Sequence, residues 1–187
     1  LLSVRSGARV SMPGMMETVL NVGITPEVAQ SMADSSGNAR FAWDSYRRFI
    51  EMYGKIVCDV NPEEFHKVQE RILESHTITN LQDLDVDGLK ALADGFIKVI
   101  EAATGKDFPT DPREHLIGSI EAVFRSWNSE RATLYRRRER IPSDLGTAVN
   151  IQSMVFGNLS DDSGTGVAFT RNPSNGEIGS YGDYLQK

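Results

Sequence analysis

The sequence is poor in the features that mark secreted, membrane-spanning and nucleic-acid-binding proteins. Its 187 residues include a single cysteine, Cys58, so no disulfide can form within the chain and a reducing compartment is indicated. No stretch reaches the roughly 18 apolar residues that a membrane-spanning helix needs. The formal net charge of −6 disfavours nucleic acid as a partner. We therefore expect a cytoplasmic protein that acts on neither membranes nor nucleic acid.

What is present is the composition of an ordinary globular domain. Hydrophobic residues make up 40% and charged residues 25% of the chain, values that disfavour disorder and coiled coil. The length suits one domain, with or without a large insertion. Three segments place a capping side chain before proline: Thr25-Pro26, Asn61-Pro62 and Asp111-Pro112. Proline suits the first helical position because its missing N–H would have no partner there, so each segment predicts a helix start.

Apolar residues at helical spacing follow these caps. The stripes are Ala42, Tyr46, Phe49, Ile50 and Tyr53; Phe65, Val68 and Ile72; Leu89, Leu92, Phe96, Val99 and Ile100; and Leu116, Ile120, Val123, Phe124 and Trp127. Gly105 is a plausible C-cap, and a further helix is predicted over Glu130–Arg140. The middle of the chain is therefore predicted to be helical.

Strands are predicted near the two ends of the chain. Val4 lies in a short apolar strand, followed by a glycine-containing loop and one helical turn at Met16–Leu20. Residues 148–156 and 167–170 are rich in β-branched and apolar side chains. We predict that they form two antiparallel strands joined by the connection Gly157–Gly166, with a turn at Asn172–Gly176 after them.

Several segments could bind an anion, and each also has a simpler explanation. The glycines and hydroxyls of Ser160–Gly166 could surround phosphate groups, or could form a polar hairpin loop. Arg5 stands at a strand end, where its guanidinium could hold a phosphate or could lie in a surface turn. One guanidinium of the pair Arg47 and Arg48 could point inward, or both could be solvated.

Other residue types are equally open. Three methionines within Met12–Met16 could line the flat face of an aromatic base, or could fill a core. Glu177 and Asp183 follow the glycine-rich connection and could hold Mg²⁺ beside a polyphosphate, or could be surface charges. The three histidines show no metal-ligand spacing, and no catalytic Ser-His-Asp or Cys-His arrangement is visible.

Taken together and in this order, these segments resemble the nucleotide-binding domain of pyruvate phosphate dikinase. The resemblance is carried by Ser3–Ala8, Ser11–Asn21 with its Met-Pro-Gly-Met-Met run, Arg40–Ile50, Ala122–Trp127, Gly146–Asn150, Met154–Asn158, Ser163–Pro173 and Tyr181–Leu185. Pyruvate, water dikinases share the Val-Arg-Ser beginning but differ after it. They are the alternative, together with a non-catalytic helical interaction module built on residues 25–110.

The resemblance implies an α+β fold, namely a partial ATP-grasp domain with an inserted, mainly helical subdomain. Residues 1–24 would be a piece of the first lobe, 25–110 the insertion, and 111–187 a piece of the second lobe with a glycine-rich phosphate loop. In the family, ATP pyrophosphorylates a histidine on a separate domain. That histidine passes phosphate to inorganic phosphate and the ATP β-phosphate to pyruvate, giving AMP, pyrophosphate and phosphoenolpyruvate.

The resemblance also implies roles for individual residues. Arg5 would stabilise charge on the transferred phosphates, and Arg48, with Arg47 as the alternative, would reach the same site. The other expected nucleotide contacts are Gly14 and Met16 along the nucleotide, Gln152, Met154 and Val155 at the adenine edge, Thr165 and Gly166 as the phosphate loop, and Glu177 and Asp183 as nearby acidic residues. No residue is assigned as a metal ligand.

The expected cofactors are ATP and Mg²⁺, and the expected partner is the phosphohistidine domain of the same full-length chain, which is expected to be a homodimer. By the resemblance, the essential lysine of the family precedes this chain. The metal-binding carboxylates and the carrier histidine follow it. We therefore expect the chain to be inactive alone.

Overall fold

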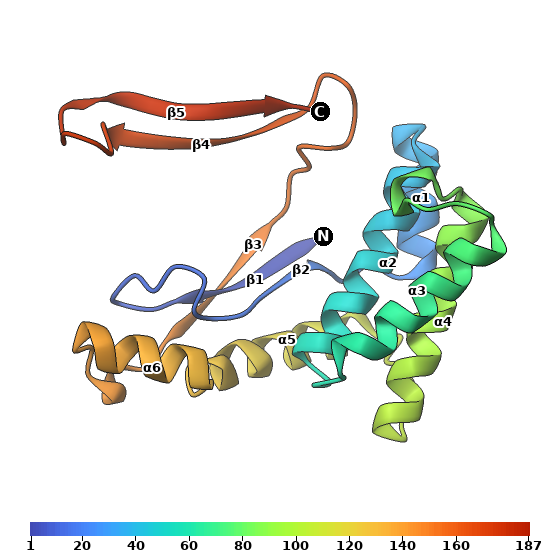
Figure 1. Cartoon of the computed structure of the whole chain (residues 1–187), viewed down its shortest axis with the longest axis horizontal. Helices are drawn as coiled ribbons and strands as arrows, with labels where there is room; N and C mark the ends of the chain where they lie inside the picture. Colours follow the sequence, from blue (N-terminus) through green and yellow to red (C-terminus); the bar gives the residue numbers. More distant parts are fainter.

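The computed structural model describes residues 1–187 and contains six α-helices and five β-strands (Figure 1). The helices are α1 (Pro26–Ser36), α2 (Ala39–Ile56), α3 (Pro62–Ser75), α4 (Val86–Thr104), α5 (Pro112–Ser126) and α6 (Glu130–Glu139). The strands are β1 (Leu2–Gly7), β2 (Thr18–Val22), β3 (Ala148–Ser153), β4 (Gly164–Arg171) and β5 (Ile178–Gln186), with short 3₁₀ turns at Leu81–Asp83 and Ser143–Leu145. The predicted α+β class is confirmed.

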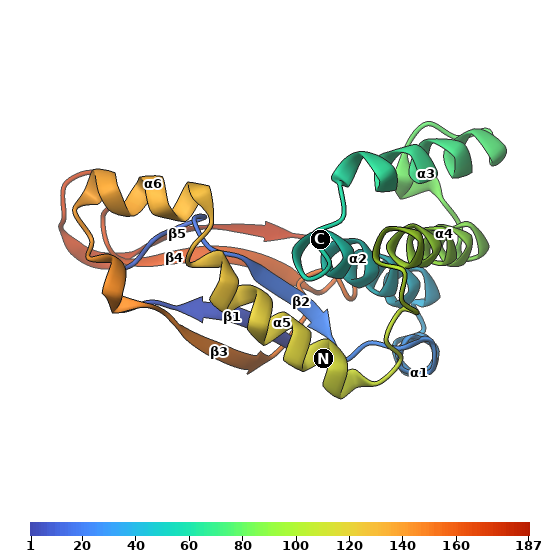
Figure 2. The same cartoon turned by 90° about the horizontal axis from the view of Figure 1, so that it is seen from below.

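The strands form two separate antiparallel sheets. β1 lies between β2 and β3 in a three-stranded sheet, whereas β4 pairs only with β5. α5 packs across one face of the three-stranded sheet, and the β4–β5 hairpin lies on the opposite side (Figures 1 and 2). Helices α1–α4 gather at one end of the molecule and α6 lies toward the other. No helix combines the length and apolar character that crossing a bilayer requires.

Strand pairing differs from the prediction. β3 does not pair with β4; it pairs with β1, in register from Leu2 opposite Ser153 to Gly7 opposite Ala148. β4 pairs instead with β5 around the predicted turn at Asn172–Gly176. The prediction of a hairpin across Gly157–Gly166 is therefore wrong. The partner of β3 is β1, at the other end of the chain, and no local sequence pattern could predict this pairing.

Two smaller predictions are also wrong. Thr18–Val22 is a strand, so the helical turn expected at Met16–Leu20 is absent; Val19 is fully buried in the core that also contains Val4. Pairing with β1 outweighs the weak local preference of this segment. On α5, Phe124 is exposed, because Ala122 and Val123 face the interior instead.

The predicted helix starts are confirmed. The capping bonds run from the N–H groups of Val28, Glu63 and Arg113 to the side-chain oxygens of Thr25, Asn61 and Asp111. Gly105 ends α4 in the left-handed conformation, with φ of 67°. These side chains satisfy N–H groups that have no partner within a helix, so the sequence determines the helix starts locally.

The hydrophobic core is continuous between the sheet and the helices. Val4 and Val19 of the sheet belong to the same buried cluster as Phe49 of α2, Phe96 of α4 and Val123 of α5. The stripe predicted on α2 is entirely buried within it. Among helices α1–α4, α2 packs directly against β2, and the others reach the sheet through the shared core. The boundaries predicted at residues 24 and 110 remain a prediction.

A buried histidine makes the stability of this core depend on pH. His115 is 1% exposed, its Nε2 lies 2.6 Å from the carbonyl oxygen of Pro109, and the rings of Phe49 and Phe108 pack against it. Burial lowers the pKa of His115 and outweighs the opposing effects of the Pro109 carbonyl, Glu114 and Asp111. The folded state therefore favours neutral imidazole.

We expect the free energy of unfolding to fall as the pH drops below about 6.5, the ordinary histidine pKa, because the unfolded chain then binds a proton that the folded chain resists. The slope from this residue is at most about 1.4 kcal/mol per pH unit. Denaturant titrations between pH 5 and 8 measure it. His115→Gln should remove the slope, and His66→Gln, on the exposed face of α3, should keep it. An unchanged slope in His115→Gln would show that another group is responsible.

Candidate functional site

A cavity of about 580 Å³ lies beside the β1–β2 loop, and we call it the loop cavity. Its lining includes Arg5, Gly14, Met16, Thr18 and Asn150. Arg5 stands opposite Thr18 on β2 and Asn150 on β3. Side chains alternate along a strand, so Arg5 points away from the α5 face on which Val4 is buried. The three polar side chains thus share the sheet face that is turned toward the β4–β5 hairpin.

The Arg5 guanidinium has no protein partner. The side chain is exposed, and none of the ion pairs of the chain involves it. A guanidinium carries five donors in a planar fork that matches phosphate oxygens. Arg5 is therefore free to bind an anion on the open face of the sheet.

The methionine segment fills a small second core. Met12 and Met16 are each 8% exposed and pack with Trp127 and Ala132. Of the two explanations that the sequence left open, the structure favours core filling, although Met16 also lines the loop cavity. Gly14 has φ of 70°, a conformation that side chains disfavour, so glycine is required at this turn.

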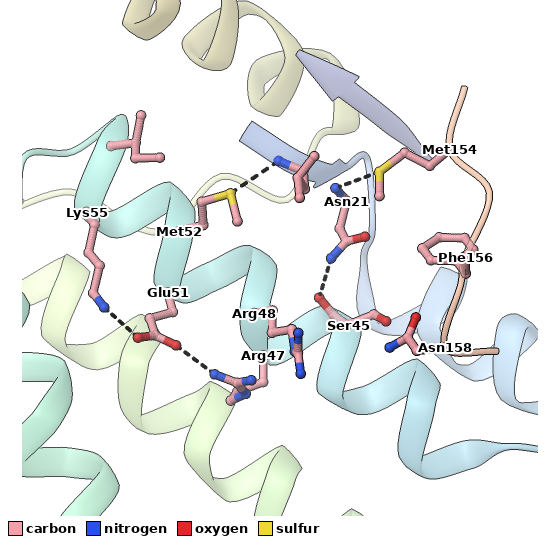
Figure 3. Close-up of a pocket in the computed structure, with 12 residues that line it drawn as sticks. Asn21, Ser45, Arg47, Arg48, Glu51, Met52, Lys55, Met154, Phe156 and Asn158 are labelled. Atoms are coloured by element: carbon pink, nitrogen blue, oxygen red, sulfur yellow. Dashed lines mark hydrogen bonds and ion pairs between the residues drawn. The ribbon is translucent and has the colours of Figure 1, made fainter. Parts of the chain in front are cut away.

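A second cavity, of about 500 Å³, lies where α2 meets β2 and the segment after β3; we call it the helix cavity (Figure 3). Its apolar lining consists of Leu20, Met52, Ile56, Met154 and Phe156, and its polar lining of Asn21, Ser45, Arg47, Arg48, Glu51, Lys55 and Asn158. The sulfur atoms of Met52 and Met154 each accept a backbone N–H, from Leu20 and Asn21, at 3.2 Å. These contacts hold the two methionines as walls of the cavity.

Charged side chains of α2 form a ladder along the helix cavity. Arg47 is buried and donates to Asp44 at 2.7 Å and to Glu51 at 2.6 Å, and Glu51 accepts from Lys55 at 2.5 Å. Arg48 donates through Nε to the other oxygen of Asp44, at 2.7 Å. Of the arginine pair, Arg47 points inward and Arg48 stays exposed at the cavity.

Asp44 and Glu51 are site residues that the sequence reasoning missed. The sequence spacing could have indicated them, because a carboxylate three or four residues from an arginine lies on the same helix face and can pair with it. Burial alone raises the pKa of Asp44, but the charges and hydrogen bonds of Arg47 and Arg48 outweigh it and hold the pKa below its ordinary value. Asp44 is thus ionised at neutral pH.

The remaining predicted residues line neither of these cavities. Gln152 pairs with Ser3 within the sheet, and Val155, just after β3, is 95% exposed. Thr165 and Gly166 were expected in a loop, but they lie in β4, opposite Leu185 and Tyr184. The loop is shorter than predicted because pairing with β5 begins already at Gly164.

Glu177 and Asp183 do not form a metal site. Glu177 lies at the hairpin turn and Asp183 stands opposite Val167 in β5. Six residues of extended chain separate them by about 20 Å, too far to share one ion. The chain contains no group of three or more acidic, histidine or cysteine side chains that could hold a metal.

A cavity with apolar walls and a few convergent polar groups is the usual form of a small-molecule site. Comparison with known proteins agrees. Residues 1–182 match the family described as pyruvate phosphate dikinase, AMP/ATP-binding domain. The chain belongs to this family.

Relatives from distant organisms share about half of the sequence. The chain is 53% identical over 186 residues to pyruvate, phosphate dikinase of Clostridium symbiosum, covering 99% of this chain and 21% of that protein. It is 51% identical over 185 residues to chloroplastic pyruvate, phosphate dikinase 1 of Arabidopsis thaliana, covering 99% of this chain and 19% of that protein. It is 47% identical over 188 residues to pyruvate, phosphate dikinase of Giardia intestinalis, covering 100% of this chain and 21% of that protein. The chain thus spans about a fifth of the length of these relatives. Because one relative is chloroplastic, the cytoplasm remains a prediction.

Proposed function

We propose that this chain is the ATP-binding part of a pyruvate phosphate dikinase. In that reaction a histidine on another domain takes a pyrophosphoryl group from ATP, releasing AMP. It then passes one phosphate to inorganic phosphate and the ATP β-phosphate to pyruvate, so the further products are pyrophosphate and phosphoenolpyruvate. The observation that supports the proposal most directly is the unpaired Arg5 guanidinium on the open sheet face, within a chain whose residues 1–182 match an AMP/ATP-binding family.

The proposed fold is a partial ATP-grasp domain, with the nucleotide between the three-stranded sheet and the β4–β5 hairpin. Arg5, with Thr18 and Asn150 beside it, would hold the phosphates. Thr165 and Gly166 of the hairpin would contact them from the other side. Support comes from the placement of the hairpin over the face that carries Arg5 (Figures 1 and 2).

The base end of the nucleotide is proposed to lie at the exit of β3. Gln152, Met154 and Val155 would meet the adenine edge, and Gly14 and Met16 would lie along the nucleotide. Arg48, which shares the helix cavity with Met154, would reach from α2 toward the phosphates. Glu177 and Asp183 are proposed only as acidic residues near the site.

Arg5 would act on charge rather than on protons. As the histidine nitrogen attacks the β-phosphorus and AMP leaves, negative charge shifts among the phosphate oxygens. A fixed guanidinium stabilises that charge without reorganising. Mg²⁺ would accompany ATP and neutralise phosphate charge. The phosphohistidine domain and a homodimeric full-length enzyme complete the proposal.

Isothermal titration of Mg-ATP tests the proposal. We expect binding by the full-length protein that carries this chain and much weaker binding by the chain alone, since each lost charge-assisted contact costs about 1.5–3 kcal/mol. Dependence of phosphoenolpyruvate formation on added inorganic phosphate separates the proposal from a pyruvate, water dikinase. Failure of both folded proteins to bind ATP would overturn the nucleotide role and favour a helical interaction module.

A further inference from the structure

Arg48 is held on one side and free on the other. Its Nε donates to Asp44 at 2.7 Å, and its two Nη atoms have no hydrogen-bond partner in the chain. The side chain is 57% exposed, whereas that of Asp44 is 11% exposed. Arg48 lines the helix cavity and Asp44 does not. The two Nη atoms of Arg48 are thus available at the cavity. Asp44, which anchors the guanidinium through Nε, lies outside the cavity lining.

The anchor is itself fixed. The second oxygen of Asp44 receives two hydrogen bonds from Arg47, through Nε at 3.1 Å and Nη2 at 2.7 Å. Arg47 is tied in turn to Glu51. Arg47 is nearly fully buried, so this part of the ladder is rigid. An exposed arginine normally samples many rotamers, and ordering it costs free energy when a ligand binds.

From this geometry we propose that Asp44 is a positioning residue, which orients Arg48 so that its free Nη atoms receive an anionic group of the nucleotide. The inference rests on the proposed function, because it takes a phosphate of ATP as the anion. Asp44 would not touch the nucleotide. Asp44 would raise the affinity for ATP only by ordering the Arg48 side chain before ATP binds.

Charge alone predicts the opposite effect of removing Asp44. A carboxylate near an anion site repels the ligand, so neutralising it should strengthen ATP binding if Asp44 acted only through its charge. Positioning predicts weaker binding. Glu64 supplies the matched control, because this carboxylate also pairs with a cation on a helix, with Lys67 at 2.6 Å, but lines neither of the two cavities.

The test measures the Kd for Mg-ATP in the full-length protein and its variants. Asp44→Asn keeps the shape of the side chain and should weaken binding roughly two- to twelvefold, the cost of ordering one long side chain. Arg48→Met should weaken binding by about tenfold or more. Adding Asp44→Asn to Arg48→Met should cause no further loss. Glu64→Gln should leave binding unchanged.

Each other outcome is informative. Tighter binding by Asp44→Asn would leave only a charge effect and overturn the inference. An equal loss from Asp44→Asn with and without Arg48 would assign Asp44 a structural role, which also overturns it. If Arg48→Met bound ATP with unaltered affinity, Arg48 would not contact the nucleotide, and Asp44 would have no binding residue to orient. Absence of ATP binding by the unaltered protein would instead overturn the proposed function, a result distinct from the other three.

Discussion

Replacing Arg5 with methionine is expected to reduce phosphoenolpyruvate formation by the full-length protein by about a thousandfold or more. Arginines that stabilise the charge of a transferred phosphoryl group contribute on this scale. Arg5 stands on the open sheet face beside Thr18 and Asn150, with no ion pair inside the chain. On the proposed function, loss of its guanidinium would therefore remove a contact to substrate and no contact within the fold. The turnover rate at saturating ATP is the measurement.

The stability of Arg5→Met distinguishes a substrate contact from a structural one. Because Arg5 has no partner to lose, the free energy of unfolding should change by less than about 0.5 kcal/mol. Arg113→Met, which removes an equally exposed arginine in the first turn of α5, should retain full turnover. An Arg5→Met protein that retains turnover within a few-fold would show that the phosphates lie elsewhere.

Local signals explain why the helices could be predicted from the sequence. Thr25, Asn61 and Asp111 cap helices through bonds to N–H groups two or three residues away, and the stripes behind them need only the 3.6-residue period. Strand partners are different. β1 and β3 are separated by more than 140 residues, so their pairing depends on where the intervening helices place them. The strand conformation of Thr165 and Gly166 could not be predicted for the same reason, because it depends on pairing with β5.

The sequence could predict which kinds of residue form the candidate site, but not where these residues lie relative to one another. Arg5 could be singled out from the sequence because it follows an apolar residue in a short strand. It lies within β1 rather than at the expected strand end, and it does lie on an open face. The sequence could not show that Arg48 lies at a different cavity from Arg5, since that separation arises from the packing of α2 against β2. Nor could it choose between Arg47 and Arg48 for the inward position, because adjacent residues on a helix differ by only about 100° in direction.

Replacing Phe49 with alanine is expected to lower the free energy of unfolding by about 3–5 kcal/mol, the usual cost of truncating a buried phenylalanine. Phe49 is 0% exposed, and its ring lies 5.5 Å from that of Tyr53 and 4.8 Å from that of His115 on α5. It thus joins the helices to the element that covers the sheet. Because the core is continuous, the sheet and helices should unfold together rather than in two steps.

Urea titrations followed separately through the two tryptophans measure this cooperativity. Trp43 reports on α2 and Trp127 on the end of α5. In each variant that retains one tryptophan, the midpoint from fluorescence should therefore equal the midpoint from far-UV circular dichroism of the same variant. Phe169→Ala is the matched control: this ring is 48% exposed in the β4–β5 hairpin, and its removal should cost far less. Two distinct midpoints would contradict a shared core and support a helical subdomain that folds independently. A common midpoint that shifts in Phe49→Ala would mean that the helices stabilise the very sheet on which Arg5 is displayed.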